Sequence, residues 1–409
     1  MAEGRRFTWE RAPFEQCPMC QKDESYGVLS AGGATLTRRC KECGFSEGVK
    51  LPNVDKKVIY LDQFAFSELF KLRAGKRRED AHTAFWKAVD EQLNRVALLQ
   101  QAIFPPSDVH HSETLVSPWP QELRDAYEAL AGDVRLEDTN HIQLSQIAAF
   151  GRAFIANGTP ELDLDIDNAI RGRRNAWLQD MRITVNTDYS QFADDTRASV
   201  DETAQAVVDL MEGWRKRGVG FDEVLEIELG NYHQSRLGAL QAYADRYANA
   251  VAADDFMAEF NLGMSSIVRE MSILRDIFSR AGVPSVQLDD TIAAFWKWEG
   301  NRDQPFGQIL AYMFAALAGQ VKAGRTKPAS RGFMNDVKAI AAYAPYVDAM
   351  LVDKECATLL GEGRPRDELE YRARIFSLNT KDEFLAYLKE LEDSAPDEVR
   401  HFAGIAYRV

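Results

Sequence analysis

The stretch that decides the fold is Phe333-Met-Asn-Asp336-Val-Lys-Ala-Ile-Ala-Ala-Tyr-Ala-Pro-Tyr-Val-Asp348-Ala-Met-Leu-Val-Asp353-Lys. It predicts a helix with an acid, Asp336, near its start. A buried strand, residues 349–352, then ends at a second acid, Asp353. An earlier strand, Lys57-Val-Ile-Tyr-Leu, ends in the same way at Asp62. Open α/β sheets place their functional sites at the carboxyl ends of their strands, so the strand ends predict one shared site.

Acids that converge on one point predict a bound cation. Several carboxylates held close together cannot all stay ionised without a partner. Hard divalent cations prefer oxygen ligands. The pattern therefore indicates metal-dependent chemistry, with phosphate as the expected substrate group.

The composition is that of a large globular chain. Its 409 residues are enough for two or three domains, and 45% of them are hydrophobic, which excludes a disordered chain. The longest apolar run, residues 309–321, is too short to span a bilayer, and the first residues lack the apolar core of a signal peptide. We therefore expect a cytoplasmic protein with no membrane partner. The net charge of −14 argues against wide coating of a nucleic acid, although local basic patches would still allow a nuclease.

The cysteines predict a metal site of a different kind. Four of the five lie in the first 43 residues, as Cys17-Pro-Met-Cys20 and Cys40-Lys-Glu-Cys43. Two such pairs supply four thiolates for a tetrahedral zinc ion, and the clustering favours metal over disulfides in a cytosolic chain. Four protein ligands leave no open coordination position, so the predicted zinc is structural. The segment resembles a zinc ribbon, with a hairpin turning at Gly32-Gly33.

The rest of the chain alternates between α/β and helical patterns. Short strands are predicted near residues 103 and 376, and a helix is predicted to follow Ser107 as its N-cap. The predicted divisions are a zinc ribbon at residues 1–50, an α/β domain in two halves at residues 57–115 and 330–409 that share one sheet, and an all-helical insertion at residues 116–329. The sequence contains no Gly-x-Gly-x-x-Gly or Walker motif, so no nucleotide cofactor is expected.

The acids occur in the order of a known nuclease family. Val58-Ile-Tyr-Leu-Asp62-Gln-Phe-Ala-Phe-Ser-Glu-Leu resembles the opening strand and helix of a PIN-like nuclease domain, and Phe104-Pro-Pro-Ser-Asp-Val-His-His-Ser-Glu113 resembles its second segment. Asp336-Val-Lys-Ala-Ile-Ala and Val352-Asp353-Lys-Glu-Cys are similar to its third and fourth segments, and Ile375-Phe-Ser-Leu to its last strand. The resemblance covers residues 57–115 and 330–395. The long helical insertion departs from the compact family, as does Gln63, where a small polar residue is more usual.

The resemblance implies a PIN-like parallel α/β sheet and a Mg²⁺- or Mn²⁺-dependent phosphodiesterase that acts on RNA. Asp62, Glu113, Asp336 and Asp353 would hold one or two catalytic metals. Asp348 competes with Asp336 for the third position. Because Asp348 lies at a strand start, we expect it behind the ligands, where it could also touch metal. The chain would then be an endoribonuclease, with a toxin or anti-phage defence role as a further hypothesis.

Other interpretations stay open. A catalytically inactive scaffold or nucleic-acid-binding protein of this fold, and a DNA nuclease acting on single strands, both fit the pattern. A homo-oligomer or a regulatory protein partner is also compatible with it. His110 and His111 lie close to Glu113 and could contact phosphate, or could be ordinary satisfied polar residues. Three basic clusters could grip a phosphate backbone or be solvated: Lys76, Arg77 and Arg78; Arg171, Arg173 and Arg174; and Lys322, Arg325, Lys327 and Arg331.

Overall fold

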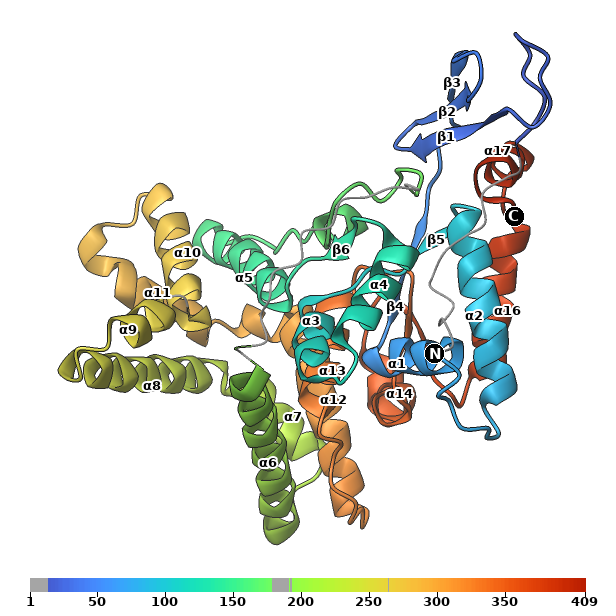
Figure 1. Ribbon diagram of the computed structural model, residues 1–409. Coiled ribbons are helices and arrows are strands. Elements are labelled where there is room, and N and C mark those ends of the chain that lie inside the picture. The colour runs from blue at the N-terminus through green and yellow to red at the C-terminus, as the bar shows by residue number, and fades with distance from the viewer. Residues whose placement is uncertain (1–13, 179–190, 192, 264) are drawn as a thin grey trace.

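A computed structural model describes residues 14–178, 191, 193–263 and 265–409 of the chain (Figure 1). The first residues of the predicted ribbon, 1–13, and residues 179–190, 192 and 264 of the predicted insertion lie outside the described residues. Within them, no helix is both long and apolar enough to cross a membrane.

Three antiparallel strands form the N-terminal sheet: β1 (Tyr26–Gly32), β2 (Thr35–Cys40) and β3 (Ser46–Lys50), in the order β1-β2-β3. The pairing of β1 with β2 confirms the predicted hairpin. Gly33 turns it with a φ of +61°, a left-handed conformation that glycine adopts without strain. The third strand was not predicted, because its side chains are largely exposed and carry no apolar alternation.

The main sheet joins the two ends of the chain. Its strands are β4 (Lys57–Leu61), β5 (Ala102–Ile103), β8 (Ala349–Leu351) and β9 (Arg374–Phe376), in the order β5-β4-β8-β9. All three neighbouring pairs are parallel. Tyr60 of β4 lies opposite Met350 of β8, which confirms the prediction that the two halves share one sheet. β4 and β8 are the central strands, so their carboxyl ends lie next to each other.

Alternate residues of β4 enter two different cores, because successive side chains of a strand point to opposite faces. Ile59 and Leu61 pack with α1 (Gln63–Arg73), α2 (Thr83–Leu98), α16 (Lys381–Asp393) and α17 (Asp397–Tyr407). Val58 and Tyr60 pack with α12 (Pro305–Lys322), α13 (Phe333–Tyr343) and α14 (Lys354–Gly361). Helices therefore cover both faces of the sheet (Figure 1).

The described residues between the two halves are mainly helical, as predicted, and they include one short antiparallel pair of strands, β6 (Arg135–Leu136) and β7 (Ile170–Arg171). Among them, helices α5 (Thr139–Ala156), α10 (Ser266–Arg280) and α11 (Leu288–Lys297) enclose a separate core around Phe150, Leu274 and Phe295. The other described α-helices of the chain are α3 (Asp108–Val116), α4 (Pro120–Ala131), α6 (Ala193–Arg217), α7 (Phe221–Gly230), α8 (Tyr232–Ala252), α9 (Phe256–Gly263) and α15 (Gly363–Glu368).

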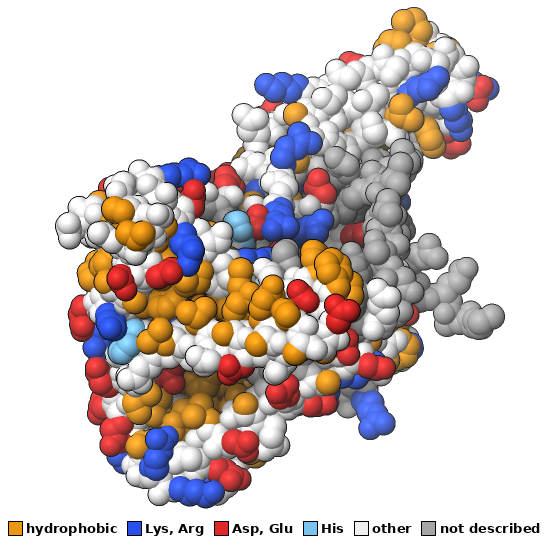
Figure 2. Space-filling model, turned by 90° about the vertical axis from the view of Figure 1, so that its left-hand side faces the viewer, with side chains coloured by type: hydrophobic (Ala, Val, Ile, Leu, Met, Phe, Trp, Pro, Cys, Tyr) orange, Lys and Arg blue, Asp and Glu red, His pale blue; other side chains and the backbone are white. Residues whose placement is uncertain are grey.

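Large apolar side chains are exposed on three consecutive helices of this segment. They are Ile227 on α7, Leu237, Tyr247 and Val251 on α8, and Phe256, Met257 and Phe260 on α9. Figure 2 shows hydrophobic side chains spread widely over the face that it presents. Large exposed apolar side chains gathered on neighbouring helices are typical of a contact surface. The predicted homo-oligomer or protein partner remains a prediction.

Candidate metal sites

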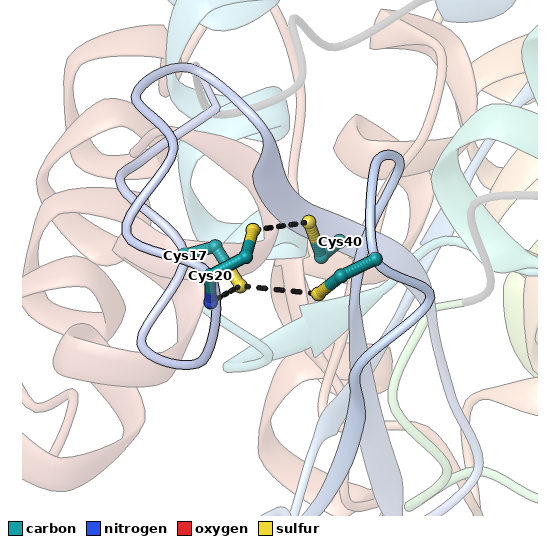
Figure 3. A group of neighbouring side chains, drawn as sticks. Cys17, Cys20 and Cys40 are labelled. Carbon is teal, nitrogen blue, oxygen red and sulfur yellow. Dashed lines mark hydrogen bonds between the residues drawn. The ribbon is translucent and has the colours of Figure 1, made fainter.

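The side chains of Cys17, Cys20 and Cys40 point toward one another (Figure 3), and Cys43 completes the group of four. Their ligand atoms all lie within 4.8 Å of one another, with Cys17 Sγ 3.7 Å from Cys43 Sγ and Cys20 Sγ 3.8 Å from Cys40 Sγ. Zinc–sulfur bonds of about 2.3 Å in a tetrahedron require sulfur–sulfur distances of about 3.8 Å. The donor set and its spacing therefore fit a tetrahedral zinc ion.

Backbone amides donate hydrogen bonds that stabilise negative charge on the cysteine sulfurs. The amides of Met19 and Cys20 donate to Cys17 Sγ, and the amide of Glu42 donates to Cys40 Sγ at 3.4 Å. Burial raises the pKa of Cys40, but contacts with Ser25 and with backbone amides outweigh it and bring the pKa to about 6. Because all four ligands come from the chain, a zinc ion here would be structural, as in the predicted ribbon.

Two acids of the second site cap helices at the ends of the central strands. Asp62 follows β4 and accepts a hydrogen bond from the amide of Gln63 at 2.6 Å. Asp353 follows β8 and accepts one from the amide of Cys356 at 2.6 Å. Acids are favoured at helix N-termini, where unpaired amides and the helix dipole stabilise negative charge. Because β4 and β8 are parallel neighbours, the two caps lie at the same edge of the sheet.

The other two acids reach this edge from helices. Glu113 projects from α3, and its Oε1 accepts a hydrogen bond from Asn335 Nδ2 on α13 at 3.2 Å. Asp336 lies in the first turn of α13. A Cβ atom built on Gly332 would lie 3.6 Å from the Asp336 carboxylate and 3.9 Å from Glu113 Oε1, so both acids border the same small space. We call Asp62, Glu113, Asp336 and Asp353 the acidic cluster.

The acidic cluster has no cationic partner among the residues that the structure describes. Within the described residues, none of its four carboxylates forms an ion pair with a lysine, arginine or histidine. Burial, followed by the charges of Glu113 and Asp353, raises the pKa of Asp62 to about 8. Burial and the other three acids raise the pKa of Asp336 well above its usual range. Burial also raises the pKa of Glu113, although Asn335 opposes this. A bound divalent cation would relieve this repulsion.

One neighbour of the cluster, Cys356, was not predicted from the sequence. Its thiol is fully buried, and its sulfur and ligand atoms of Asp336 and Asp353 all lie within 4.8 Å of one another. Burial, then the charges of these two acids, raise the pKa of Cys356 well above its usual range. Cys356 is three residues after the N-cap Asp353, a spacing that returns its backbone amide to the cap. This spacing in the sequence could have placed Cys356 beside the acids.

Asp348 requires a correction. The structure places it before β8, at the opposite end of that strand from Asp353, and not behind the metal ligands as we had expected. Its carboxylate accepts a hydrogen bond from the Val58 amide at 2.9 Å and pairs with Lys57 Nζ at 3.3 Å and Arg372 at 2.7 Å. The strand lies between Asp348 and the acidic cluster. Asp348 therefore links β4, β8 and the residues that precede β9.

The two histidines of α3 differ in their surroundings. His110 is fully buried, and burial lowers its pKa to about 3. The Ser107 amide donates to His110 Nδ1 at 3.0 Å, so the ring proton lies on Nε2, which donates to the Leu61 carbonyl at 2.6 Å. This neutral ring ties α3, which carries Glu113, to the residue before Asp62. His111 is exposed.

Most side chains of the predicted basic clusters contact other residues of the protein. In the third cluster, for example, Arg325 forms an ion pair with Glu355 at 2.5 Å. Pairs of the same kind hold Arg77 with Glu68 and Asp80, Arg171 with Glu137, Arg174 with Asp55, Lys322 with Glu223 and Arg331 with Asp201, while Lys76 lies over the Trp119 ring. These side chains are therefore less available to a phosphate backbone than their sequence density indicated.

Comparison with known proteins adds no relative. No family model, no curated protein and no solved structure matches the chain. The class that the structure defines is therefore a mixed α/β protein with a four-stranded parallel sheet, many helices and an N-terminal cluster of four cysteines that could hold zinc.

Proposed function

We propose that this chain is a metal-dependent nuclease with a PIN-like catalytic domain, and that it acts as an endoribonuclease. The acidic cluster carries the proposal. Four carboxylates from separate segments face the carboxyl edge of a parallel sheet without a cation from the described chain, and ligand atoms of Asp336 and Asp353 lie within 4.8 Å of each other. Burial raises the pKa values of Asp62, Asp336 and Glu113. A stable fold gains nothing from such repulsion, so it is most simply explained by a ligand that is a cation.

The residues around the proposed site have separable roles. Asp62, Glu113, Asp336 and Asp353 would hold Mg²⁺ or Mn²⁺. Such a cation supplies a Lewis acid that stabilises charge on a phosphodiester and favours deprotonation of water. The amides of Gln63 and Cys356 orient Asp62 and Asp353.

Hydrogen bonds from outside the cluster complete this arrangement. Asn335 orients Glu113, and His110 fixes the backbone carbonyl that precedes Asp62. Side chains held in this way need little reorganisation when a cation binds.

RNA is the proposed substrate because the order of the acids resembles a family that usually cleaves it. A toxin or defence role belongs to the same proposal, since a cytosolic endoribonuclease needs control. The zinc held by the cysteines would keep the N-terminal sheet folded and take no part in catalysis.

Cleavage of labelled substrates tests the proposal. The purified protein is incubated with single-stranded RNA and matched DNA, with Mn²⁺, with Mg²⁺, or without added divalent cation. Asp62→Asn and Asp353→Asn remove charge but keep good helix caps, because asparagine caps helices as well as aspartate does. Asp290→Asn is the matched control: it lies exposed in the first turn of α11, a helix of the separate core.

The expected result is metal-dependent RNA cleavage that is lost in both cluster variants and unchanged in the control. Loss of two or more orders of magnitude is expected when a metal ligand is removed, since the charge stabilisation it supports is worth several kcal/mol. Cleavage of DNA alone would replace RNA as the substrate. Equal cleavage by wild type and Asp62→Asn would assign the activity to a contaminant and refute the site.

A further inference from the structure

Helix α8 lies almost wholly outside the cores of the protein, and it extends away from the parallel sheet (Figure 1). Among the side chains of its 21 residues whose exposure the structure describes, Ala250 alone is buried. One side of the helix is attached: Leu240 and Tyr243 pack beside the separate core, and Arg236 Nε lies 3.4 Å from Glu270 Oε1. Most helices gain their stability from packing an apolar face, so the rest of α8 is expected to meet a partner.

A second side of α8 carries apolar residues at the spacing of a coiled coil. Their intervals alternate between three and four residues, which places them on one stripe of the helix surface, the a and d positions of a heptad. Three of them are 39–50% exposed, so no element of the described structure covers the stripe. We call these residues the α8 seam: Leu237, Leu240, Ala244, Tyr247 and Val251.

The α8 seam lies in a stretch of low charge. Residues 237–251 include one acid, Asp245, and one base, Arg246, and at about 100° per residue both fall outside the seam. The neighbouring coiled-coil positions, Gln241 and Ala248, are uncharged. A chain with a net charge of −14 repels a second copy over much of its surface, but this stretch adds no repulsion. It also lacks the flanking charges by which coiled coils select a different partner.

The α8 seam complements itself when two copies run antiparallel. With a twofold axis between residues 245 and 246, Ala244 of one copy faces Tyr247 of the second copy, and Leu240 faces Val251. The small alanine leaves room for the tyrosine ring, which is the alternation of small and large side chains that close packing of helices requires. A twofold axis repeats each pairing, so both matches occur twice.

Helix α9 enlarges the apolar surface that a second copy could cover. It follows α8 and packs against it, and its Phe256, Met257 and Phe260 are 57–74% exposed. At about 200 Å² per side chain, these three and the three exposed residues of the seam present about 600 Å² of surface. A standard interface buries about 800 Å² on each partner, of which roughly 60% is apolar. The apolar area is therefore sufficient for a stable homodimer.

We propose that the α8 seam is a homodimer interface, in which α8 packs antiparallel against α8 of a second copy of this chain. The exposed side chains of α9 extend the contact. Because a twofold contact closes on itself, association stops at two copies. The inference does not rest on the proposed nuclease, since no residue of the acidic cluster lies on α8 or α9.

Sedimentation velocity of the full-length protein tests the inference. Wild type is measured over a wide range of concentration beside the seam variants Leu237→Glu and Val251→Glu. Val286→Glu is the matched control, because Val286 is an 86% exposed valine between α10 and α11, outside the seam. It adds the same negative charge to the chain, so general repulsion between copies is equal in all three variants.

Wild type and Val286→Glu are expected to reach twice the mass of one chain. Each seam variant is expected to dissociate at least about tenfold more readily, because its new carboxylate would lose hydration in the interface without a partner. Both seam positions are exposed in a single copy, so the variants should keep the helical circular dichroism of wild type. An unchanged spectrum separates a lost interface from misfolding.

A mixture of two further variants tests the register. Ala244→Glu and Tyr247→Lys should each weaken the homodimer, whereas the mixture should form a mixed dimer, because the introduced glutamate of one copy meets the introduced lysine of the other. A mixture without mixed dimers would overturn the inference. A wild type that stays monomeric, a dimer that both seam variants leave unchanged, or growth beyond two copies would overturn it as well.

Discussion

Replacing Asp62 with asparagine is expected to stabilise the metal-free protein. The pKa of Asp62 is about 8 in the folded state and near 3.8 when unfolded. Between these values the folded state keeps a proton that the unfolded state has released, so stability falls as pH rises. At about 1.36 kcal/mol per pH unit, the loss from about pH 5 to about pH 8 is about 4 kcal/mol. The Asp62→Asn variant lacks this contribution to the loss, because its amide does not titrate, and it keeps the helix cap.

Differential scanning fluorimetry provides the assay. An unfolding entropy of about 2.1 cal/mol/K per residue over the chain converts about 4 kcal/mol into a shift of about 5 °C. The difference in Tm between Asp62→Asn and wild type should therefore grow by about this amount from about pH 5 to about pH 8. The difference is the proper readout, because the low pKa of His110 makes stability rise with pH below about 6.5 in both proteins.

Metal addition should reverse the order of stability. Mn²⁺ binds only the folded cluster, so it should raise the Tm of wild type and have a smaller effect on Asp62→Asn. Asp290→Asn should follow wild type in every condition. A variant that is less stable than wild type at both pH values, or a difference that does not depend on pH, would refute the reasoning that uncompensated charge is stored at this site.

Two further predictions concern other parts of the chain. Cys20→Ser should lose the single zinc ion expected per chain, measured by metal analysis of the purified protein, because three thiolates leave the tetrahedron incomplete; Cys356→Ser should retain it, and equal zinc in both variants would contradict the cysteine site. His110→Phe should lower unfolding free energy by about 2–5 kcal/mol in urea titration, because Leu61 and Ser107 lose buried hydrogen bonds, whereas His111→Phe should change it by less than about 1 kcal/mol. Equal effects of the two histidine substitutions would show that the hydrogen bonds of His110 do not stabilise the fold.

The parts of the fold that the sequence predicted depend on local signals. The strand before Asp62 and the helix after Ser107 are marked by apolar runs and by capping residues within a few positions. The cysteine cluster is equally local, since each Cys-x-x-Cys pair forms one knuckle. β3 was missed because an exposed edge strand needs no apolar alternation.

What the sequence could not predict depends on partners far along the chain. Arg325 looked available because Glu355, its partner, lies thirty residues away behind a helix and a strand. Density of charge in sequence therefore predicts poorly which cations remain free, because close cations attract the acids that neutralise them.

The contrast between Asp348 and Asp353 shows which edge of the sheet is suited to a cation. Both acids flank the three-residue strand β8, and both sit beside β4. At the amino edge, Asp348 receives Lys57 and Arg372, so its charge is compensated by the chain itself. At the carboxyl edge, Asp353 receives only a helix amide and stands with three more acids. The fold therefore neutralises the acid at the amino edge with its own cations. At the carboxyl edge, the negative charge of four carboxylates is left uncompensated. Either protonation of the carboxylates or binding of a cation from solution would compensate that charge. At neutral pH a divalent cation does so while the carboxylates stay ionised.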